Sequence, residues 1–148
     1  MLSFRGRLIK FLLQNRHLLQ LRLKKEIVDW SKYEAILGFR QQVEAGAGKF
    51  GKLPENIKIS PVNINKLYAE WISSVASENN RVILYFHGGG YVSGSCKAHR
   101  AITAKFVKGS GIGALLFEYR LAPEEPYPAA LEDALAAYRW LLDEALIL

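Results

Sequence analysis

Apolar and polar positions in the second half of the chain fall into blocks that predict strands and helices in turn. Residues 82–86 and 114–119 are short, continuous runs of β-branched, aliphatic and aromatic side chains, the pattern of buried strands. Residues 97–108 between them predict a helix, and a last helix is predicted over 129–146, with Pro128 at its start. The order strand, helix, strand, helix predicts a right-handed unit with parallel strands, and hence an α/β fold.

The middle of the chain carries the pattern of a hairpin. Residues 57–62 and 67–72 read as two strands, and Asn63-Ile-Asn-Lys66 between them predicts the turn. The polar stretch 73–80 predicts a loop before the next strand. A hairpin followed by the strand–helix unit would form one sheet with helices packed against it.

The N-terminal region predicts helices of two kinds. Ser31 and Glu34 have the spacing of a capping box, in which each side chain bonds the other's free amide, so a helix is predicted from there to residue 43. Residues 1–25 combine leucine and phenylalanine with seven cations and no acid: Arg5, Arg7, Lys10, Arg16, Arg22, Lys24 and Lys25. The formal net charge of the whole chain is +6, so the basicity belongs to this end.

Three interpretations of residues 1–25 stay open: a lid helix packed on a catalytic domain, a helix that docks on an anionic lipid surface, and a targeting peptide. Nucleic-acid binding is disfavoured, because the cations are interleaved with leucines. The single cysteine excludes an internal disulfide and favours a reducing, cytoplasmic location, with peripheral membrane association as a variant. No apolar run approaches the roughly 18 residues of a membrane span.

Two motifs carry the chemistry. The predicted strand 82–86 runs directly into His87-Gly-Gly-Gly90, and three adjacent glycines suit a backbone that must bring its own N–H groups close to a ligand. About thirty residues later comes Tyr119-Arg-Leu-Ala-Pro-Glu124, followed by a proline-punctuated helix start. From about residue 53 to 142 the chain resembles the hormone-sensitive-lipase-like branch of the α/β-hydrolase superfamily, in which H-G-G-G is the oxyanion-hole element.

The resemblance implies a role for each residue of the first motif. The backbone N–H groups of Gly89 and Gly90 would stabilise the oxyanion of a tetrahedral intermediate, with His87 and Gly88 supporting the loop. Tyr91 is a candidate for the substrate pocket. The implied reaction is hydrolysis of carboxylic esters with small to medium acyl groups, by serine attack and histidine proton transfer, without a metal or cofactor.

The serine nucleophile of that family is missing from these 148 residues. No G-x-S-x-G is present: Gly90-Tyr-Val-Ser-Gly94 has its serine one place too late. The expected architecture is the N-terminal half of an α/β-hydrolase fold, a mostly parallel sheet with a first hairpin and flanking helices. Cap helices over 1–50 would precede a truncated catalytic part over 51–148, with all three triad residues outside it. Alone, the chain is expected to be inactive.

A half-fold of this kind has consequences for partners. The strand 82–86 would lack the neighbour that carries the nucleophile, and an open sheet edge invites pairing with another chain. We therefore expect docking with a C-terminal half, or self-association. The alternatives are a non-catalytic binding or scaffold protein that holds ester or carboxylate ligands, and a peripheral membrane protein acting through residues 1–25.

Several other residues are weighed and set aside. His87 as general base is disfavoured, because the family's triad histidine comes late in the chain. Cys96 and His99 could suggest a dyad or half a metal site, but packing and a polar contact are the simpler interpretations. The sequence 109–114 fits a dinucleotide fingerprint but precedes a strand instead of following one.

The loop after the second strand is expected to hold an ion-pair network. Arg120, Glu124 and Glu125 are its predicted members. The family more often has aspartate in place of Glu118 and histidine in place of Glu125, which leaves the local hydrogen bonding open. His17 is expected on the surface of the first helix.

Overall fold

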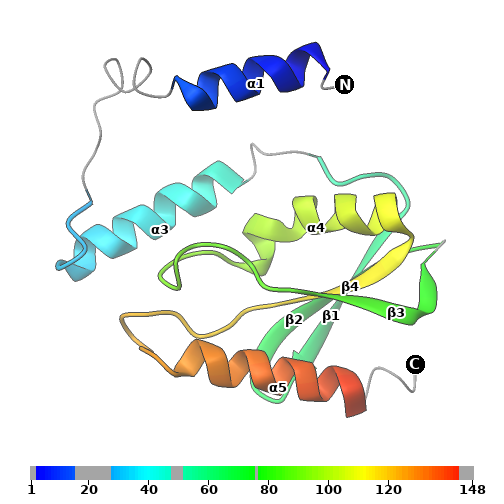
Figure 1. The fold of residues 1–148 in the computed structure, drawn as a ribbon. Helices are drawn as coiled ribbons and strands as arrows, with labels where there is room; N and C mark the ends of the chain where they lie inside the picture. The colour runs from blue at the N-terminus through cyan, green and yellow to red at the C-terminus, as the bar shows by residue number, and fades with distance from the viewer. Residues whose placement is uncertain (1–2, 16–27, 48–51, 76, 144–148) are drawn as a thin grey trace.

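The computed structural model describes residues 3–15, 28–47, 52–75 and 77–143 (Figure 1). A four-stranded sheet is formed by β1 (Ile57–Ile64), β2 (Leu67–Ser74), β3 (Glu78–Tyr85) and β4 (Ile112–Phe117). The strand order is β1-β2-β4-β3, with β3 and β4 parallel and the other two pairs antiparallel. The α/β class and the first hairpin are therefore confirmed, and the sheet is mixed.

The sheet is covered by one helix on each face (Figure 1). The helices are α4 (Cys96–Ser110) and α5 (Ala129–Asp143). Side chains of β4 alternate between them: Ala114 and Leu116 pack in the cluster on the α4 side, whereas Leu115 and Phe117 pack in the cluster that includes α5. All four are fully buried, so β4 is the centre of both cores.

The strand β3 lies at one edge of the sheet. It pairs with β4 from Val82 to Tyr85, and in the part of the chain that the structure describes no strand pairs with its other side. Val82 to Tyr85 are only partly buried, whereas the central strand β4 is buried almost throughout. This edge exposes unpaired backbone groups beside apolar side chains.

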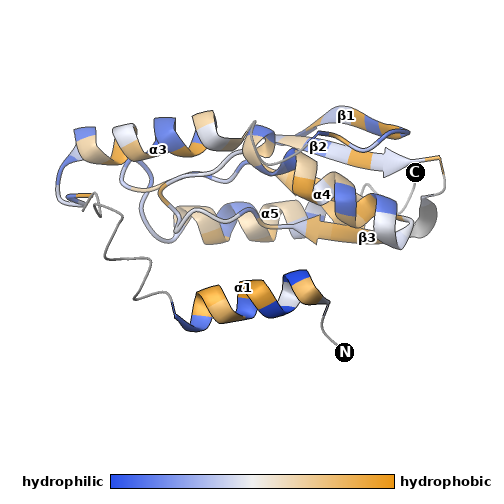
Figure 2. Ribbon diagram, turned by 90° about the horizontal axis from the view of Figure 1, so that it is seen from above, coloured by the Kyte–Doolittle hydropathy of each residue, from blue (hydrophilic) through white to orange (hydrophobic). Residues whose placement is uncertain are grey.

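Two further helices precede the sheet. α3 (Tyr33–Ala47) lies beside the start of α4 and the loops that follow β3 and β4, whereas α1 (Phe4–Gln14) lies apart from the rest in both ribbon views (Figures 1 and 2). None of the residues of α1 is buried. Residues 16–27, with His17, lie outside the described part. No helix in that part is long and apolar enough to cross a bilayer.

Two local predictions are wrong. The stretch 73–80 is no continuous loop, because β2 extends to Ser74 and β3 begins at Glu78, with an irregular register between Glu78 and Val82. The capping box does not form. The Ser31 hydroxyl donates to Asp29 Oδ1 at 2.6 Å, and the helix begins at Tyr33, where the Lys32 carbonyl accepts the first hydrogen bonds.

Candidate functional site

The glycine loop, residues 87–95, connects β3 to α4 through a tight turn. The carbonyl of Gly89 accepts three hydrogen bonds: from the Val92 amide at 3.2 Å, the Ser93 amide at 3.1 Å and the Ser93 hydroxyl at 3.0 Å. Gly90 and the following Tyr91 both have left-handed backbones, with φ of 63° and 62°. A tyrosine in this region is strained, so the surrounding contacts must hold the turn in place.

Two glycines of the loop are required by space. At Gly89, with φ of 139°, a Cβ would lie 1.9 Å from the Ser93 carbonyl oxygen. At Gly94, with φ of 105°, it would lie 2.4 Å from the Gly88 carbonyl oxygen and from His87 Nδ1. At Gly90 nothing lies within 4 Å, so only the left-handed φ favours glycine there.

The close packing leaves two adjacent backbone donors unused. Among the residues that the structure describes, the N–H groups of Gly89 and Gly90 donate no hydrogen bond, although the Gly89 carbonyl is fully engaged. Both glycines line an open cleft of about 890 Å³. Preorganised, unpaired N–H groups at a cleft can receive a negatively charged oxygen.

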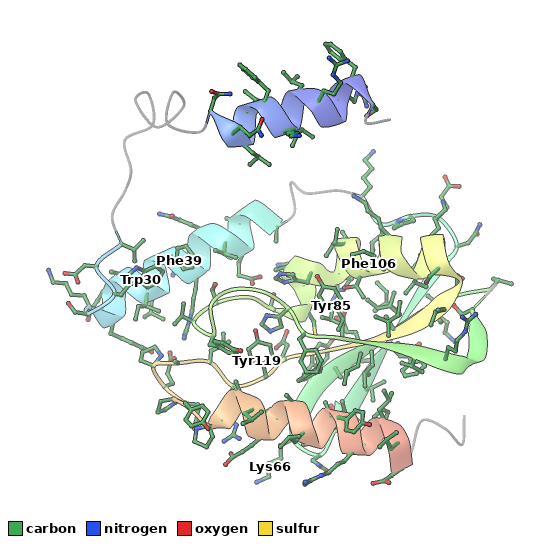
Figure 3. The ribbon with its side chains drawn as sticks, in the orientation of Figure 1. Trp30, Phe39, Lys66, Tyr85, Phe106 and Tyr119 are labelled. Carbon is green, nitrogen blue, oxygen red and sulfur yellow. The ribbon has the colours of Figure 1, made fainter. Side chains whose placement is uncertain are left out.

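The cleft lies between the glycine loop, the loop after β4 and the start of α5. Its walls are largely aromatic and aliphatic, formed by Phe86, Tyr91, Tyr119, Tyr127, Leu131 and Ala134. Two charged side chains of the loop after β4, Arg120 and Glu125, also line it. Figure 3 places the labelled Tyr119 between the glycine loop and α5. Tyr91, the candidate pocket residue, has 67% of its surface exposed. Such a cleft suits a small apolar molecule with one polar end.

His87 lies beneath the glycine loop and is only 4% exposed. Its ring is stacked on Tyr119, with centroids 4.1 Å apart, and on His99, with centroids 5.3 Å apart. Nδ1 lies 3.1 Å from the Gly88 carbonyl oxygen, so Nδ1 carries the proton, and Nε2 has no partner among the described residues. Burial lowers the pKa of His87, which keeps the imidazole neutral and packed.

Cys96 and His99 do not form a dyad. Cys96 is fully buried, its Sγ lies 3.6 Å from the Leu116 carbonyl oxygen, and burial raises the pKa of the thiol. His99 Nδ1 lies 3.2 Å from the Ser95 carbonyl oxygen. A thiol held neutral in a core is no nucleophile, and both residues are explained by packing and local hydrogen bonds. Within the described ranges, no three His, Cys, Asp or Glu side chains are grouped as a metal site.

The predicted ion pairs of the loop after β4 are confirmed, although one partner differs. Arg120 binds Asp133 at 2.9 Å, and it reaches Glu125 only at 3.8 Å. Glu124 instead pairs with Arg40 of α3 at 2.7 Å. The hydrogen bond from Arg40 is the main reason that the pKa of Glu124 falls to about 2.

The structure shows how Glu118 is hydrogen-bonded. Its Oε1 accepts from the Cys96 amide at 3.1 Å, so the carboxylate caps the first turn of α4. A second acceptor at this helix end is the Ser95 hydroxyl, which takes the Ala98 amide at 3.0 Å. The glycine loop is thus anchored where it becomes helix.

Four residues of the site were not predicted from the sequence: Arg40, Glu44, Ser93 and Gly94. Gly94 follows the glycine run closely enough for its role to have been suspected. Arg40 and Glu44 contact the glycine loop from 52 and 51 residues away in the chain. No local pattern in the sequence marks either contact.

Comparison with known proteins gives one consistent result. Residues 83–146 match a family model described as the alpha/beta hydrolase fold. An acetyl-hydrolase of Streptomyces hygroscopicus is 39% identical over 97 residues, which are 66% of this chain and 31% of that protein. An ethyl acetate hydrolase of Pseudomonas putida is 43% identical over 63 residues, which are 43% of this chain and 20% of that protein.

Solved structures extend the similarity beyond the matched sequence. An esterase from the bacterial hormone-sensitive lipase family superposes with a TM-score of 0.68 at 40% identity, over 72% of this chain and 36% of that one. A hormone-sensitive lipase from a metagenome library gives a TM-score of 0.74 at 31% identity, over 92% and 43% of the two chains. The chain spans less than half of these relatives.

Proposed function

The chain belongs to the hormone-sensitive-lipase-like branch of the α/β-hydrolase superfamily, and on that premise we propose that it supplies the oxyanion-stabilising part of a carboxylic ester hydrolase. The observation that carries the proposal is the pair of N–H groups on Gly89 and Gly90, adjacent and unused within the described part of the chain. Both belong to a turn that is held in place, before a ligand arrives, by the close packing at Gly89 and the three hydrogen bonds to its carbonyl. Preorganisation is what distinguishes an oxyanion hole from an ordinary polar surface.

In the proposed reaction a serine hydroxyl adds to the ester carbonyl and the carbonyl oxygen becomes an oxyanion. Gly89 and Gly90 donate to that oxygen, and each donor at about 2.7–3.1 Å lowers the barrier by roughly 3 kcal/mol. The serine, the histidine that takes its proton and the acid that orients the histidine would come from segments that carry the family's G-x-S-x-G and later motifs. The neutral, buried His87 holds the loop and transfers no proton.

The proposed substrates are esters with small to medium acyl groups. The related acetyl-hydrolase and ethyl acetate hydrolase take their names from short acyl groups. In this chain the largely apolar walls beside the two donors offer room for an alkyl chain, and Tyr91 and Phe86 flank the glycine run. We place Tyr91 at the entrance of that pocket, because its side chain is mostly exposed.

The 148-residue chain by itself is proposed to be inactive, because its sequence holds no G-x-S-x-G serine. Purified chain should hydrolyse p-nitrophenyl butyrate no faster than buffer does. A fluorophosphonate probe, which reacts with activated serines, should label none of its residues. Labelling at any serine would overturn this proposal, and mass spectrometry of the labelled peptide would identify that serine.

The open side of β3 is the proposed docking edge for a segment that supplies the next strand. On its paired side β3 runs parallel to β4, and its side chains from Val82 to Tyr85 are apolar and only partly buried. Without that segment the chain should self-associate through this edge. Sedimentation velocity tests the proposal, since a concentration-independent monomer with a sharp melting transition would contradict it.

A second candidate function is contact with an anionic lipid surface through α1. Every described side chain of this helix is at least partly exposed, including Phe4, Ile9 and Phe11, and cations accompany them (Figure 2). Apolar and basic side chains on one exposed helix suit an anionic interface. The chain should co-sediment with phosphatidylglycerol vesicles and not with phosphatidylcholine vesicles, and reversing the charge of Arg7 and Lys10 should abolish binding. Equal binding to both vesicle types would contradict this.

A further inference from the structure

We propose that Arg40 of α3 is a positioning residue of the glycine loop, so that α3 sets the orientation of the two oxyanion donors. The effect of Arg40 on catalysis rests on the proposed function, whereas its effect on the loop does not. Its structural basis is a guanidinium group that bonds both loops lining the cleft. Arg40 belongs to α3 and is not among the residues that line the cleft.

All three side-chain nitrogens of Arg40 are engaged. Nε donates to the Val92 carbonyl at 2.5 Å, and Nη2 donates to the Ala122 carbonyl at 2.7 Å. Nη1 and Nη2 also bind the two carboxylate oxygens of Glu124, each at 2.7 Å. One planar group therefore bonds the glycine loop and the loop after β4 together, with Glu124 of the second loop as its ion-pair partner, which the point charge of a lysine could not do.

The link from Arg40 to the donors passes through a short chain of hydrogen bonds. The Val92 amide donates to the Gly89 carbonyl, and the Tyr91 carbonyl accepts from the Ala122 amide at 2.8 Å. Arg40 therefore restrains Tyr91 and Val92 from both loops, and the Val92 amide holds the Gly89 carbonyl. The peptide planes that carry the Gly89 and Gly90 N–H groups lie within or directly beside the strained segment between Gly89 and Val92.

A second side chain of α3 holds the other end of the loop. Glu44, one helical turn after Arg40, accepts from the Ser95 hydroxyl at 2.7 Å. Ser95 also caps α4 by accepting from the Ala98 amide. One face of α3 thus hydrogen-bonds the loop at both Val92 and Ser95. A shift of α3 would therefore move the N–H groups of Gly89 and Gly90.

The test compares Arg40→Gln and Arg40→Lys with the control Tyr33→Phe. The Tyr33 hydroxyl donates to the same Glu124 carboxylate at 2.8 Å and bonds neither the Val92 carbonyl nor the Ala122 carbonyl. Arg40→Gln should speed amide hydrogen exchange at Val92, Ser93 and Ala122 about tenfold or more, and Arg40→Lys should do so less. In Tyr33→Phe the exchange rates of these three amides should stay unchanged. In every variant the exchange rate of the Leu115 amide in β4 should stay unchanged.

Residual dipolar couplings of the Gly89 and Gly90 N–H bonds report their orientation directly. They should change in Arg40→Gln and stay unchanged in the control. Unchanged couplings, or exchange that rises equally at Leu115, would overturn the inference, since the second result means general destabilisation. Both measurements need no substrate, so they succeed or fail independently of the proposed ester hydrolysis.

Discussion

Tyr119 lies flat against His87, with ring centroids 4.1 Å apart and an angle of 11° between the rings, and its hydroxyl donates to the His87 carbonyl at 2.6 Å. One side chain therefore holds both the ring and the backbone of the residue at which β3 becomes the glycine loop. Tyr119 is the first residue of the second sequence motif, so this contact joins the two motifs. It ties the glycine loop to the loop after β4.

Tyr119→Phe removes this hydrogen bond and keeps the ring stack. Because the His87 carbonyl then loses a buried donor, the free energy of unfolding should fall by about 1–2 kcal/mol. Tyr138 of α5, half exposed, offers the control. Tyr138→Phe should change stability by less than about 0.5 kcal/mol. Urea unfolding measures both, and equal effects of the two variants would contradict the assigned hydrogen bond.

Alanine substitutions in the glycine loop should distinguish glycines required by close packing from a glycine favoured only by its backbone conformation. Gly89→Ala and Gly94→Ala place a Cβ inside occupied backbone and should each cost about 3 kcal/mol or more. In Gly90→Ala the added Cβ has no close neighbour and only the left-handed φ is unfavourable, so the free energy of unfolding should fall by about 1 kcal/mol.

Gly109 of α4 is the matched control for these substitutions, because a Cβ there meets nothing within 4 Å and φ is not positive. Gly109→Ala should stabilise the chain by about 0.5–1 kcal/mol. A Gly89→Ala variant as stable as Gly90→Ala would show that the turn is packed less tightly than described. Thermal unfolding of the four variants is sufficient to rank them.

A buried ion pair away from the cleft holds β2 to α4. Glu70 is fully buried and binds Arg100, and it accepts from the Tyr68 hydroxyl at 2.9 Å. Arg100→Met leaves the carboxylate without its cation and should cost about 3 kcal/mol, whereas Glu70→Met combined with Arg100→Met should restore most of that loss. A double-mutant cycle in urea measures the coupling. An Arg100→Met variant of unchanged stability would contradict this assignment.

The Arg40–Glu124 pair predicts an acid-dependent loss of stability. The pKa of Glu124 is about 2 in the folded chain, mainly because Arg40 donates to it, against an ordinary value of 4.5 for a glutamate. The stabilisation is complete above pH 4.5 and is lost as the pH falls from 4.5 towards 2, because only the unfolded chain takes up the proton in that range. The carboxyl carbon shift of Glu124 measures this pKa, and Arg40→Gln should raise it towards 4.5. No rise in that variant would contradict the pairing.

The sequence was sufficient where the signal is continuous along the chain. The continuous apolar run of β4, the hairpin of β1 and β2 and the glycine run are all short-range patterns, and they predicted the sheet and the loop. The start of β3 was missed because Glu78 begins a polar stretch at an irregular edge, where pairing with β4 outweighs local preference. The fork of Arg40 was missed because its contacts span 52 and 82 residues.

The capping box failed for a related reason. Ser31 and Glu34 have the right spacing, but the Ser31 hydroxyl is already bonded to Asp29 two residues earlier. A short side chain with two local choices is a weak guide to where a helix begins. The correct start at Tyr33 also brings the tyrosine hydroxyl to Glu124, a contact that only the folded chain can form.

The measurement that tests the central claim most directly is the rate of p-nitrophenyl butyrate hydrolysis when this chain is combined with a polypeptide carrying the family's G-x-S-x-G, acid and histidine segments. The account predicts no turnover by either part alone and turnover by the two together. Replacing Gly89 by valine should then abolish it, because the side chain would fill the space at the Ser93 carbonyl. Turnover by the 148-residue chain alone, or undiminished turnover with Gly89→Val, would contradict the account.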